Sequence, residues 1–279
     1  MGETDMQQIK LVALDLDGTV FNDEKAITPR TAAAIRAALE KGVTVLPATG
    51  RTVSGVPEQL TNIPGIRYAL TSNGASVVDL ETGKSLVRLP FDAAMALRAY
   101  DVLEPLGGML SIFIDGRSYT SMENAEQSMD MVPANLRSYF RTTRIEVEDM
   151  RRTLRDHADA IEKFSILYPT VEARDKAWQA VRRACPSVEI TTSIERNMEL
   201  NAPGVSKGRG LMALAERLDL CPDQVMAIGD SGNDLTMIEA AGLGVAMGNA
   251  TEDVRAAADV ITADNNHDGV AQAIEDYVL

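Results

Sequence analysis

The chain has 279 residues, of which 45% are hydrophobic and 24% are charged, a composition typical of a folded globular protein and not of a disordered one. Its 41 acidic and 27 basic residues give a net charge of −14, which disfavours binding to nucleic acid or to an anionic membrane surface. No apolar run reaches the roughly 18 residues of a membrane span. The first ten residues carry Glu3 and Asp5 and no apolar stretch, so we expect no secretory signal.

The two cysteines, Cys185 and Cys221, have no metal-ligand spacing and make no disulfide framework. We therefore expect a reducing, cytoplasmic location. The chain also has only two histidines, His157 and His267, so a histidine-ligated metal or a Ser-His-Asp triad is not expected.

In the first third of the chain, apolar runs alternate with a helical pattern. Runs at 9–15, 43–46 and 68–70 predict buried strands, and a helix is predicted from Thr28 until Gly42 ends it. Strands that alternate with helices in this way are typical of βαβ units and a parallel sheet.

The middle of the chain has a different pattern, with paired apolar runs that predict two hairpins at 77–80 with 85–89 and at 110–114 with 118–121. Further strands are predicted at 164–167 and 188–192, and helices at about 92–106, 125–139, 147–158 and 171–184. Strand pairs mixed with helices indicate an α+β insert with an antiparallel sheet.

The parallel pattern returns from Glu199. Helices are predicted from Ser206 and at 234–241, 252–258 and 270–277, and strands at 224–228, 244–247 and 260–261. The predicted fold class is therefore α/β, with a doubly wound, mainly parallel, Rossmann-like core sheet and an inserted α+β domain. We place the core at 1–84 and 195–279 and the insert at 85–194.

Reactive side chains follow the predicted core strands at their carboxyl ends, where open parallel sheets bind ligands. They are Asp15 and Asp17 after the first strand, Thr49 after the second, Asp230 and Asp234 after the strand at 224–228, and Lys207 before its helix. If these strands are neighbours, the four carboxylates gather in a small volume and repel one another. A hard cation such as Mg²⁺, which prefers oxygen ligands, resolves that repulsion.

This set of side chains suits phosphoryl transfer, which needs positioning and charge neutralisation. The hydroxyl of Thr49, the charge of Lys207 and the backbone N–H groups around Asp17 and Gly18 can hold phosphoryl oxygens. Of two aspartates at i and i+2, one can attack phosphorus and the other can act as acid and then as base.

The runs DLDGTV (15–20), TGR (49–51), Lys207 and GDSGND (229–234) resemble the haloacid dehalogenase superfamily, and specifically its Cof-type phosphatases with a large inserted cap of the C2 type. The resemblance covers nearly the whole chain. It implies that the insert is a cap that selects the substrate, and that the enzyme hydrolyses phosphoric monoester bonds with Mg²⁺ through an aspartyl phosphate.

The resemblance also implies roles for single residues. Asp15 would be the nucleophile and Asp17 the general acid and base, and Thr49 and Lys207 would bind the phosphoryl group. The Asp15 carboxylate, the Asp17 backbone carbonyl and Asp230 would hold Mg²⁺, with support from Asp234. The residues assigned to substrate binding are Leu16, Gly50, Asn73, Gly74 and Asn233.

One run departs from the family pattern. His267 stands where the family usually has an acidic residue before Asp-Gly-Val, which puts any role of this loop in doubt. Single motifs also have ordinary structural explanations: Asp and Gly form turns, and Asp230 to Asp234 can cap a helix.

The expected substrates are small phosphate monoesters such as sugar phosphates, handled by a monomer or weak homodimer. Three alternatives remain at this point. A phosphomutase would use the same core, a dehalogenase would also use an aspartate nucleophile, and a non-catalytic protein would only bind a phosphorylated metabolite.

Overall fold

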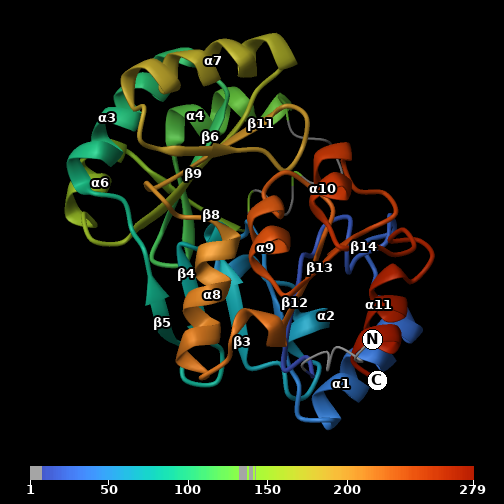
Figure 1. Cartoon of the computed structure of the whole chain (residues 1–279). Coiled ribbons are helices and arrows are strands. Elements are labelled where there is room, and N and C mark those ends of the chain that lie inside the picture. Colours follow the sequence, from blue (N-terminus) through green and yellow to red (C-terminus); the bar gives the residue numbers. More distant parts are fainter. Residues whose placement is uncertain (1–7, 132–136, 138–140, 142) are drawn as a thin grey trace. The chain divides into compact units, whose positions relative to one another are not determined.

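The computed structural model describes residues 8–131, 137, 141 and 143–279 (Figure 1). This part of the chain forms two compact units. The first contains the described residues up to Thr49 together with Val56–Val87 and Ser206–Leu279, and the second contains Gly50–Gly55 and Arg88–Val205. Within the described ranges, no helix combines the length and apolar character needed to cross a membrane.

A parallel five-stranded sheet forms the centre of the first unit, in the order β14-β13-β12-β1-β2. Its strands are β1 (Leu11–Leu14), β2 (Thr44–Pro47), β12 (Val225–Gly229), β13 (Leu243–Ala246) and β14 (Val260–Ile261). All four residues of β1 are buried, as expected for a parallel strand that is covered on both faces. The predicted fold class, a parallel α/β core, is confirmed.

Helices flank this sheet, and they are α1 (Pro29–Glu40), α2 (Glu58–Thr61), α8 (Lys207–Arg217), α9 (Leu235–Ala240), α10 (Glu252–Ala257) and α11 (Gly269–Tyr277). The Thr28 side chain caps α1 by accepting a hydrogen bond from the backbone N–H of Thr31. Val12 of β1, Ile35 of α1 and Ile274 of α11 belong to one buried apolar cluster. Figure 1 shows α8 and α9 on the other side of β12 from α11, so helices cover both faces.

A separate three-stranded sheet completes the first unit, with β3 (Tyr68–Thr71), β4 (Ser76–Asp79) and β5 (Lys84–Arg88) in that order. We predicted the strand at 68–70 as a third core strand. In the structure it pairs antiparallel with β4. Its connection to Ala48, the residue that directly follows β2, is an isolated parallel bridge from Leu70. Most of the strand pairing of β3 is therefore with its hairpin partner β4.

The second unit is built on a six-stranded sheet in the order β10-β11-β9-β6-β7-β8. Its strands are β6 (Met109–Ile114), β7 (Arg117–Ser121), β8 (Arg144–Val147), β9 (Ile161–Leu167), β10 (Glu189–Thr191) and β11 (Asn197–Asn201). The β6–β7 hairpin turns at Asp115 and Gly116, which both have positive φ, and this confirms the predicted Asp-Gly turn. Only β7 and β8 pair in parallel among the described strand pairs of this sheet.

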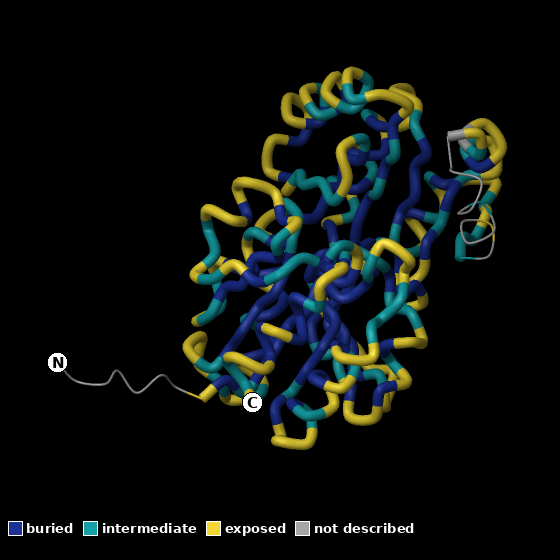
Figure 2. Tube along the Cα trace, turned by 90° about the vertical axis from the view of Figure 1, so that its right-hand side faces the viewer, coloured by how far each residue is buried: buried dark blue, intermediate teal, exposed yellow. Residues whose placement is uncertain are grey.

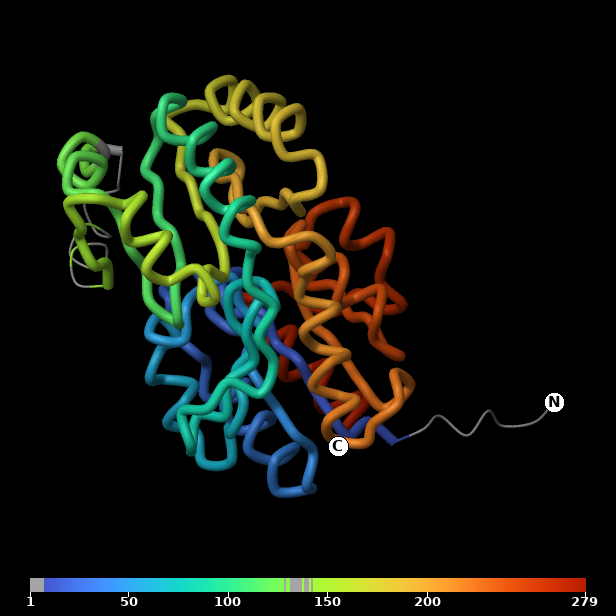
Figure 3. Tube along the Cα trace, turned by 90° about the vertical axis from the view of Figure 1, so that its left-hand side faces the viewer, coloured from blue at the N-terminus to red at the C-terminus, as the bar shows by residue number. Residues whose placement is uncertain are grey.

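The two faces of this sheet differ in chemistry. Ile112, Phe164 and Leu200 are opposite one another on β6, β9 and β11, and all three are buried. The α-helices that the structure describes in this unit are α3 (Ala93–Leu103), α4 (Met122–Ser128), α6 (Met150–Asp156) and α7 (Val171–Ala184). α3 contacts both α6 and α7 (Figure 3). Side chains alternate along each strand, so Lys163 and Glu199 project from the opposite face.

Two sequence predictions in this region differ from the structure, and a third is tested only in part. The predicted helix at 147–158 begins only at Met150, because residues 144–147 form β8. The helix predicted at 92–106 is α-helical as far as Leu103, and Pro105 lies in a single 3₁₀ turn that follows. Of the helix predicted at 125–139, the structure confirms residues 125–128 as part of α4; residues 132–136, 138 and 139 lie outside the described residues.

The boundaries between the two units also differ from the predicted boundaries at 84/85 and 194/195. The six-stranded sheet includes β11, which pairs with β9 and β10, so residues 195–205 group with the second unit. Figure 2 shows the buried parts of the trace concentrated in the strands of both units. The roles assigned to these units, catalytic core and cap, stay a prediction.

Candidate active site

The candidate site lies at the carboxyl edge of the parallel sheet in the first unit. Asp15 directly follows β1, and its backbone N–H continues the ladder to the carbonyl of Ile228 on β12 at 3.0 Å. Asp230 directly follows β12. Because β1 and β12 are parallel neighbours, the two carboxylates leave the sheet at the same edge.

Lys207 connects two of the carboxylates. Its Nζ lies 2.6 Å from Oδ1 of Asp15 and 2.5 Å from Oδ1 of Asp234. Lys207 and Asp234 are fully buried, and Asp15 is 5% exposed. Burial alone would lower the pKa of Lys207, but the charges of Asp15 and Asp234 outweigh it and raise that pKa, so the ammonium stays charged.

Close backbone packing places Lys207 at the start of α8. A Cβ on Gly74 would lie 2.1 Å from the Ser206 carbonyl, and a Cβ on Gly208 would lie 2.1 Å from the carbonyl of Thr236 in α9. Glycine is therefore required where α8 meets these two segments. The Ser206 side chain caps the helix at the backbone N–H of Arg209.

Asp234 uses its second carboxylate oxygen to close the loop that carries Asp230. Oδ2 accepts hydrogen bonds from the backbone N–H groups of Asp230 and Ser231, both at 3.0 Å. A Cβ on Gly229 would lie 2.5 Å from the Asp234 Cβ, so this loop also needs its glycine. Asp234 thus fixes both Lys207 and the loop.

The loop that follows Asp15 holds the Asp230 side chain in place. The Thr19 hydroxyl donates a hydrogen bond to Asp230 Oδ1 at 2.7 Å, and a Cβ on Gly18 would lie 2.5 Å from Asp230 Oδ2. Burial, and after it the charge of Asp234, raises the pKa of Asp230 to about 6. Asp230 therefore holds its negative charge at a cost that a nearby cation would remove.

Carboxylate oxygens of Asp15, Asp230 and Asp234 lie within 4.8 Å of one another. Burial, followed by the charge of Asp234, raises the pKa of Asp15 well above its ordinary value. Lys207 supplies one positive charge to three carboxylates. The set therefore fits a divalent cation with a preference for oxygen, as Mg²⁺ has.

Asp17 lies apart from this trio. Its side chain is 44% exposed and its Oδ1 lies 3.2 Å from the exposed Nζ of Lys25. An exposed ion pair of this kind contributes little to stability. Its predicted metal contact is through the backbone carbonyl and stays a prediction.

A polar row runs from Thr49 through Asn73 to Asn233. Thr49 is buried, and its carbonyl accepts a hydrogen bond from the Asn73 N–H at 3.2 Å. The Asn233 amide donates to Asn73 Oδ1 at 3.2 Å. Asn73 has a φ of 56°, a left-handed conformation that Asn tolerates better than most residues. The structure therefore brings these three predicted residues together.

Two other predicted substrate contacts can use only the main chain. Leu16 is fully buried in the apolar cluster, so its side chain is unavailable to a ligand. Gly50 has no side chain and groups with the second unit, where its carbonyl accepts a hydrogen bond from Lys163 Nζ of the same unit at 2.6 Å. Substrate binding by either residue stays a prediction.

His267 is exposed, with its Nδ1 2.7 Å from Asp264 Oδ1. That hydrogen bond is the main cause of a lowered pKa at Asp264. Among the described residues, His267 does not belong to the group formed by Asp15, Asp230 and Asp234.

Our sequence analysis missed Asn249. Its side-chain amide donates to the Gly18 carbonyl at 2.8 Å, and its Oδ1 accepts from the Asn265 N–H at 3.1 Å. It therefore fixes the loop that carries Asp17. Asn249 follows β13 at the same sheet edge as Asp230, so the position alone could have identified it.

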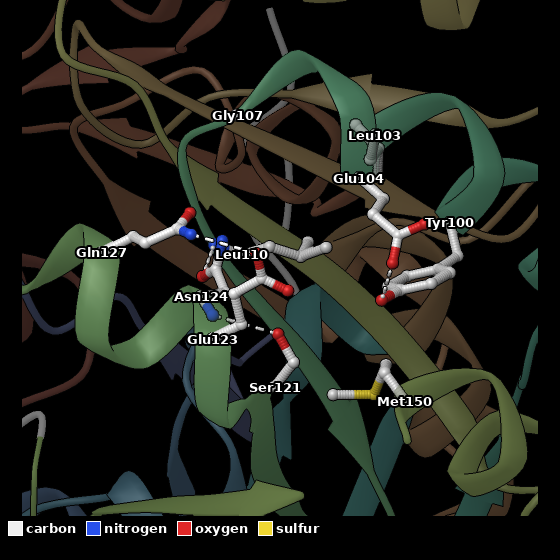
Figure 4. A pocket seen from close by; sticks show the side chains of 10 residues that line it. All are labelled: Tyr100, Leu103, Glu104, Gly107, Leu110, Ser121, Glu123, Asn124, Gln127 and Met150. Atoms are coloured by element: carbon white, nitrogen blue, oxygen red, sulfur yellow. Dashed lines mark hydrogen bonds between the residues drawn. The ribbon is translucent and has the colours of Figure 1, made fainter. Parts of the chain in front are cut away.

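The second unit has a small cavity of about 170 Å³ between α3, α4 and the neighbouring strands (Figure 4). Its polar side chains are largely paired with one another: Tyr100 donates to Glu104 at 2.6 Å, Gln127 to Glu123 at 3.0 Å, and the Asn124 N–H to Ser121 at 3.2 Å. None of the predicted site residues lines it.

Comparison with known proteins identifies the family. The sequence profile of the haloacid dehalogenase-like hydrolases matches residues 12–274. A 5-amino-6-(5-phospho-D-ribitylamino)uracil phosphatase from Bacillus subtilis is 32% identical over 97% of this chain and 96% of that protein. A pyridoxal phosphate phosphatase from Escherichia coli is 26% identical over 97% of this chain and 99% of that protein.

Among solved structures, a haloacid dehalogenase-like hydrolase from Bacillus subtilis superposes with a TM-score of 0.81 at 28% identity, covering 96% of this chain and 99% of that one. The profile match spans nearly the whole sequence, and the predictions of an enzyme and of this superfamily are confirmed. The chain belongs to the haloacid dehalogenase-like hydrolases.

Proposed function

We propose that this hydrolase cleaves small phosphate monoesters through a phosphoryl group carried on Asp15, with Mg²⁺ as its cofactor. The observation that carries the proposal is the buried Lys207, whose Nζ joins Asp15 and Asp234 beside Asp230. Three carboxylates around one lysine carry excess negative charge, which a divalent cation would offset, and Mg²⁺ held by carboxylates in this way usually also binds a substrate phosphate.

In the first step, a carboxylate oxygen of Asp15 forms a bond to phosphorus while the bond from phosphorus to the ester oxygen breaks. Lys207 holds Oδ1 of Asp15 at 2.6 Å, which leaves Oδ2 for the attack. Lys207 and the Thr49 hydroxyl would stabilise the charge on the phosphoryl oxygens. The departing oxygen takes a proton from Asp17, which must therefore enter this step protonated.

In the second step, Asp17 removes a proton from water, and the water oxygen attacks phosphorus. The bond between phosphorus and Asp15 breaks, so phosphate leaves and the carboxylate is restored. The exposed side chain of Asp17 suits this role, because one group must meet first a leaving alcohol and then water.

The residues that would hold Mg²⁺ are Asp15 and Asp230 through their carboxylates and Asp17 through its backbone carbonyl. Asp234 would support them through Lys207 and the loop of Asp230. When bound, the cation would neutralise charge on the phosphoryl oxygens.

The substrate class follows from chemistry and from relatives. Two similar proteins are named as phosphatases of a ribitylaminouracil phosphate and of pyridoxal phosphate, which are both small metabolites. We propose the same class here, sugar phosphates included, with the second unit as the cap that selects the ester. A cytoplasmic location and a monomeric or weakly dimeric state stay predictions.

The test is phosphate release from a panel of phosphate monoesters, with Mg²⁺ and with a chelator, for the wild type and Asp15→Asn. The proposal expects release that needs the metal and is lost in the variant. Free phosphate also excludes a phosphomutase, which would yield an isomer, and turnover excludes a protein that only binds. If every ester stays intact under all conditions, the proposal fails.

A further inference from the structure

The second unit contains a buried ion pair that the proposed reaction does not use. Lys163 of β9 and Glu199 of β11 are 1% and 4% exposed, and Lys163 Nζ lies 2.9 Å from Glu199 Oε1. The same Nζ lies 4.9 Å from the centre of the Phe113 ring. A buried pair is weak evidence for stability, because desolvation offsets much of the attraction between its charges. Its position therefore needs another explanation.

The ammonium of Lys163 also donates a hydrogen bond to the carbonyl of Gly50 at 2.6 Å. Gly50 is bonded directly to Thr49, the predicted ligand of the phosphoryl group. The segment Gly50–Gly55 groups with the second unit, although the chain on both sides of it belongs to the first. Lys163 thus holds the carbonyl oxygen of the residue that follows Thr49.

A second anchor holds the other end of this segment. The N–H and hydroxyl of Ser54 both donate to the Gly116 carbonyl, at 3.4 and 3.0 Å. The Gly116 N–H in turn donates to Glu162 Oε1 at 3.0 Å. Gly116 has a φ of 73°, and a Cβ there would lie 2.6 Å from Val53. Two consecutive charged residues of β9, Glu162 and Lys163, therefore support the two ends of one short segment.

Thr49 itself is fixed on its other side by the first unit. Its N–H donates to the Leu70 carbonyl at 2.9 Å, and its own carbonyl accepts from the Asn73 N–H. The position of the Thr49 side chain thus depends on these two bonds and on where the next peptide group is held. Lys163 contacts the Gly50 carbonyl through a charged ammonium. Charge-assisted hydrogen bonds of this kind are stronger than neutral ones.

We propose that Lys163, oriented by Glu199, is a positioning residue for phosphoryl binding: by fixing the Gly50 carbonyl it sets the place of Thr49. This inference rests on the proposed function. It predicts that the pair contributes to the affinity for the phosphoryl group, and not mainly to the stability of the fold.

The test variant is Lys163→Met with Glu199→Met, which replaces the ion pair by apolar side chains and leaves no buried charge alone. Such replacements are often neutral for stability, so the thermal midpoint should remain near that of the wild type. The inhibition constant for inorganic phosphate should rise about tenfold and kcat/KM should fall on the order of 100-fold, because misplacing a binding group by about 1 Å has effects of this size.

The inhibition constant is the decisive readout, since it does not depend on what fraction of the enzyme is folded. Lys163→Arg should remain within about threefold of the wild type because it keeps the charged donor. The control is Arg151→Met, which breaks ion pairs with Asp101 and Glu104 elsewhere in the second unit. It should leave the inhibition constant unchanged.

A milder variant keeps the inference testable if the double variant does not fold. Ser54→Ala removes the hydroxyl bond to Gly116 and should raise the inhibition constant by about two- to fivefold in the same direction. An unchanged inhibition constant in a folded Lys163→Met/Glu199→Met protein, or in Ser54→Ala if the double variant does not fold, would overturn the inference.

Hydrogen exchange separates this inference from the proposed function. Amides of residues 50–55 should exchange about tenfold faster in the double variant, or in Ser54→Ala if that variant replaces it, than in the wild type. If the wild type hydrolyses no ester, the proposed function fails, and the exchange result still decides whether Lys163 or its partner anchor orders this segment. Unchanged exchange would overturn the positioning claim by itself.

Discussion

Lys207 and Asp234 form an ion pair that is completely buried, with Nζ 2.5 Å from Oδ1. The second oxygen of Asp234 accepts two backbone N–H groups from the loop of Asp230. One carboxylate thus sets the position of the lysine and of a predicted metal ligand. Because Lys207 also contacts Asp15, a change at Asp234 should affect Asp15, the proposed nucleophile.

We expect Asp234→Asn to lower the free energy of unfolding by about 3 kcal/mol, the lower end of the range for a broken buried pair, because Asp15 still pairs with Lys207. Activity should fall at least tenfold. Denaturant unfolding measures the first effect. The control is Glu239→Gln on the exposed side of α9, which should stay within about 0.5 kcal/mol of the wild type. Equal stability of the two variants would contradict this account.

Thr19 should control metal affinity without touching the metal. Thr19→Val removes the hydroxyl bond to Asp230 Oδ1 and keeps the shape of the side chain. Loss of such a supporting bond typically costs about 10- to 100-fold in metal affinity. We expect the Mg²⁺ concentration for half-maximal activity to rise by that factor, and Thr19→Ser to stay close to the wild type. A normal Mg²⁺ dependence in Thr19→Val would show that this bond has no such role.

The close approach of Gly74 to α8 gives a prediction about backbone packing. Gly74→Ala would place a Cβ 2.1 Å from the Ser206 carbonyl, at a φ of +90°, and must displace the start of the helix that carries Lys207. Activity should fall by more than tenfold, and the thermal midpoint should drop. Gly83→Ala is the matched control, with a φ of +67° and no atom within 4 Å of the new Cβ. It should show only the backbone cost of about 1 kcal/mol; similar losses in both variants would count against a packing role for Gly74.

Acid should lower the stability of the first unit, in part because it protonates Asp79. A hydrogen bond from Arg67 is the largest cause of its pKa lying below the ordinary 3.8. A carboxylate whose pKa is lowered by folding stabilises the fold above pH 3.8, and that contribution disappears as the pH falls through the lower, folded value. The thermal midpoint of Asp79→Asn should therefore lie below that of the wild type at pH 7, and the two should converge below pH 3.8. Glu81→Gln, which changes an exposed neighbour of Arg67, should show a much smaller difference at pH 7.

The core of the fold could be predicted because its signals are local. Each strand of the parallel sheet is a short apolar run, and Asp15, Thr49 and Asp230 follow such runs directly. The strand at Asn197–Asn201 was missed although its polar and apolar residues alternate, because its partners β9 and β10 are set by pairing across the sheet. For the same reason the boundary of the second unit was placed too early.

The site could be predicted as a set of residues but not as a set of contacts. Asp234 was identified from its place after a predicted strand and Lys207 from its place before a predicted helix, yet only the fold shows that they share a hydrogen bond at 2.5 Å. Asn249 could have been found from its place after β13, but its contact to the Gly18 carbonyl could not. Lys163 was missed because what matters is its contact to the carbonyl of Gly50, far away in the sequence. Such contacts leave no motif.

The central claim is that Asp15 carries the phosphoryl group, and the most direct test is to trap it there. Asp17→Asn should still be phosphorylated by para-nitrophenyl phosphate, whose leaving group needs no acid, but should hydrolyse the adduct slowly because the base is missing. After acid quenching and digestion, we expect the mass of one phosphoryl group on the peptide that contains Asp15, and none in Asp15→Asn. A phosphoryl group on another residue, or no adduct while the wild type turns over the same ester, would contradict the account.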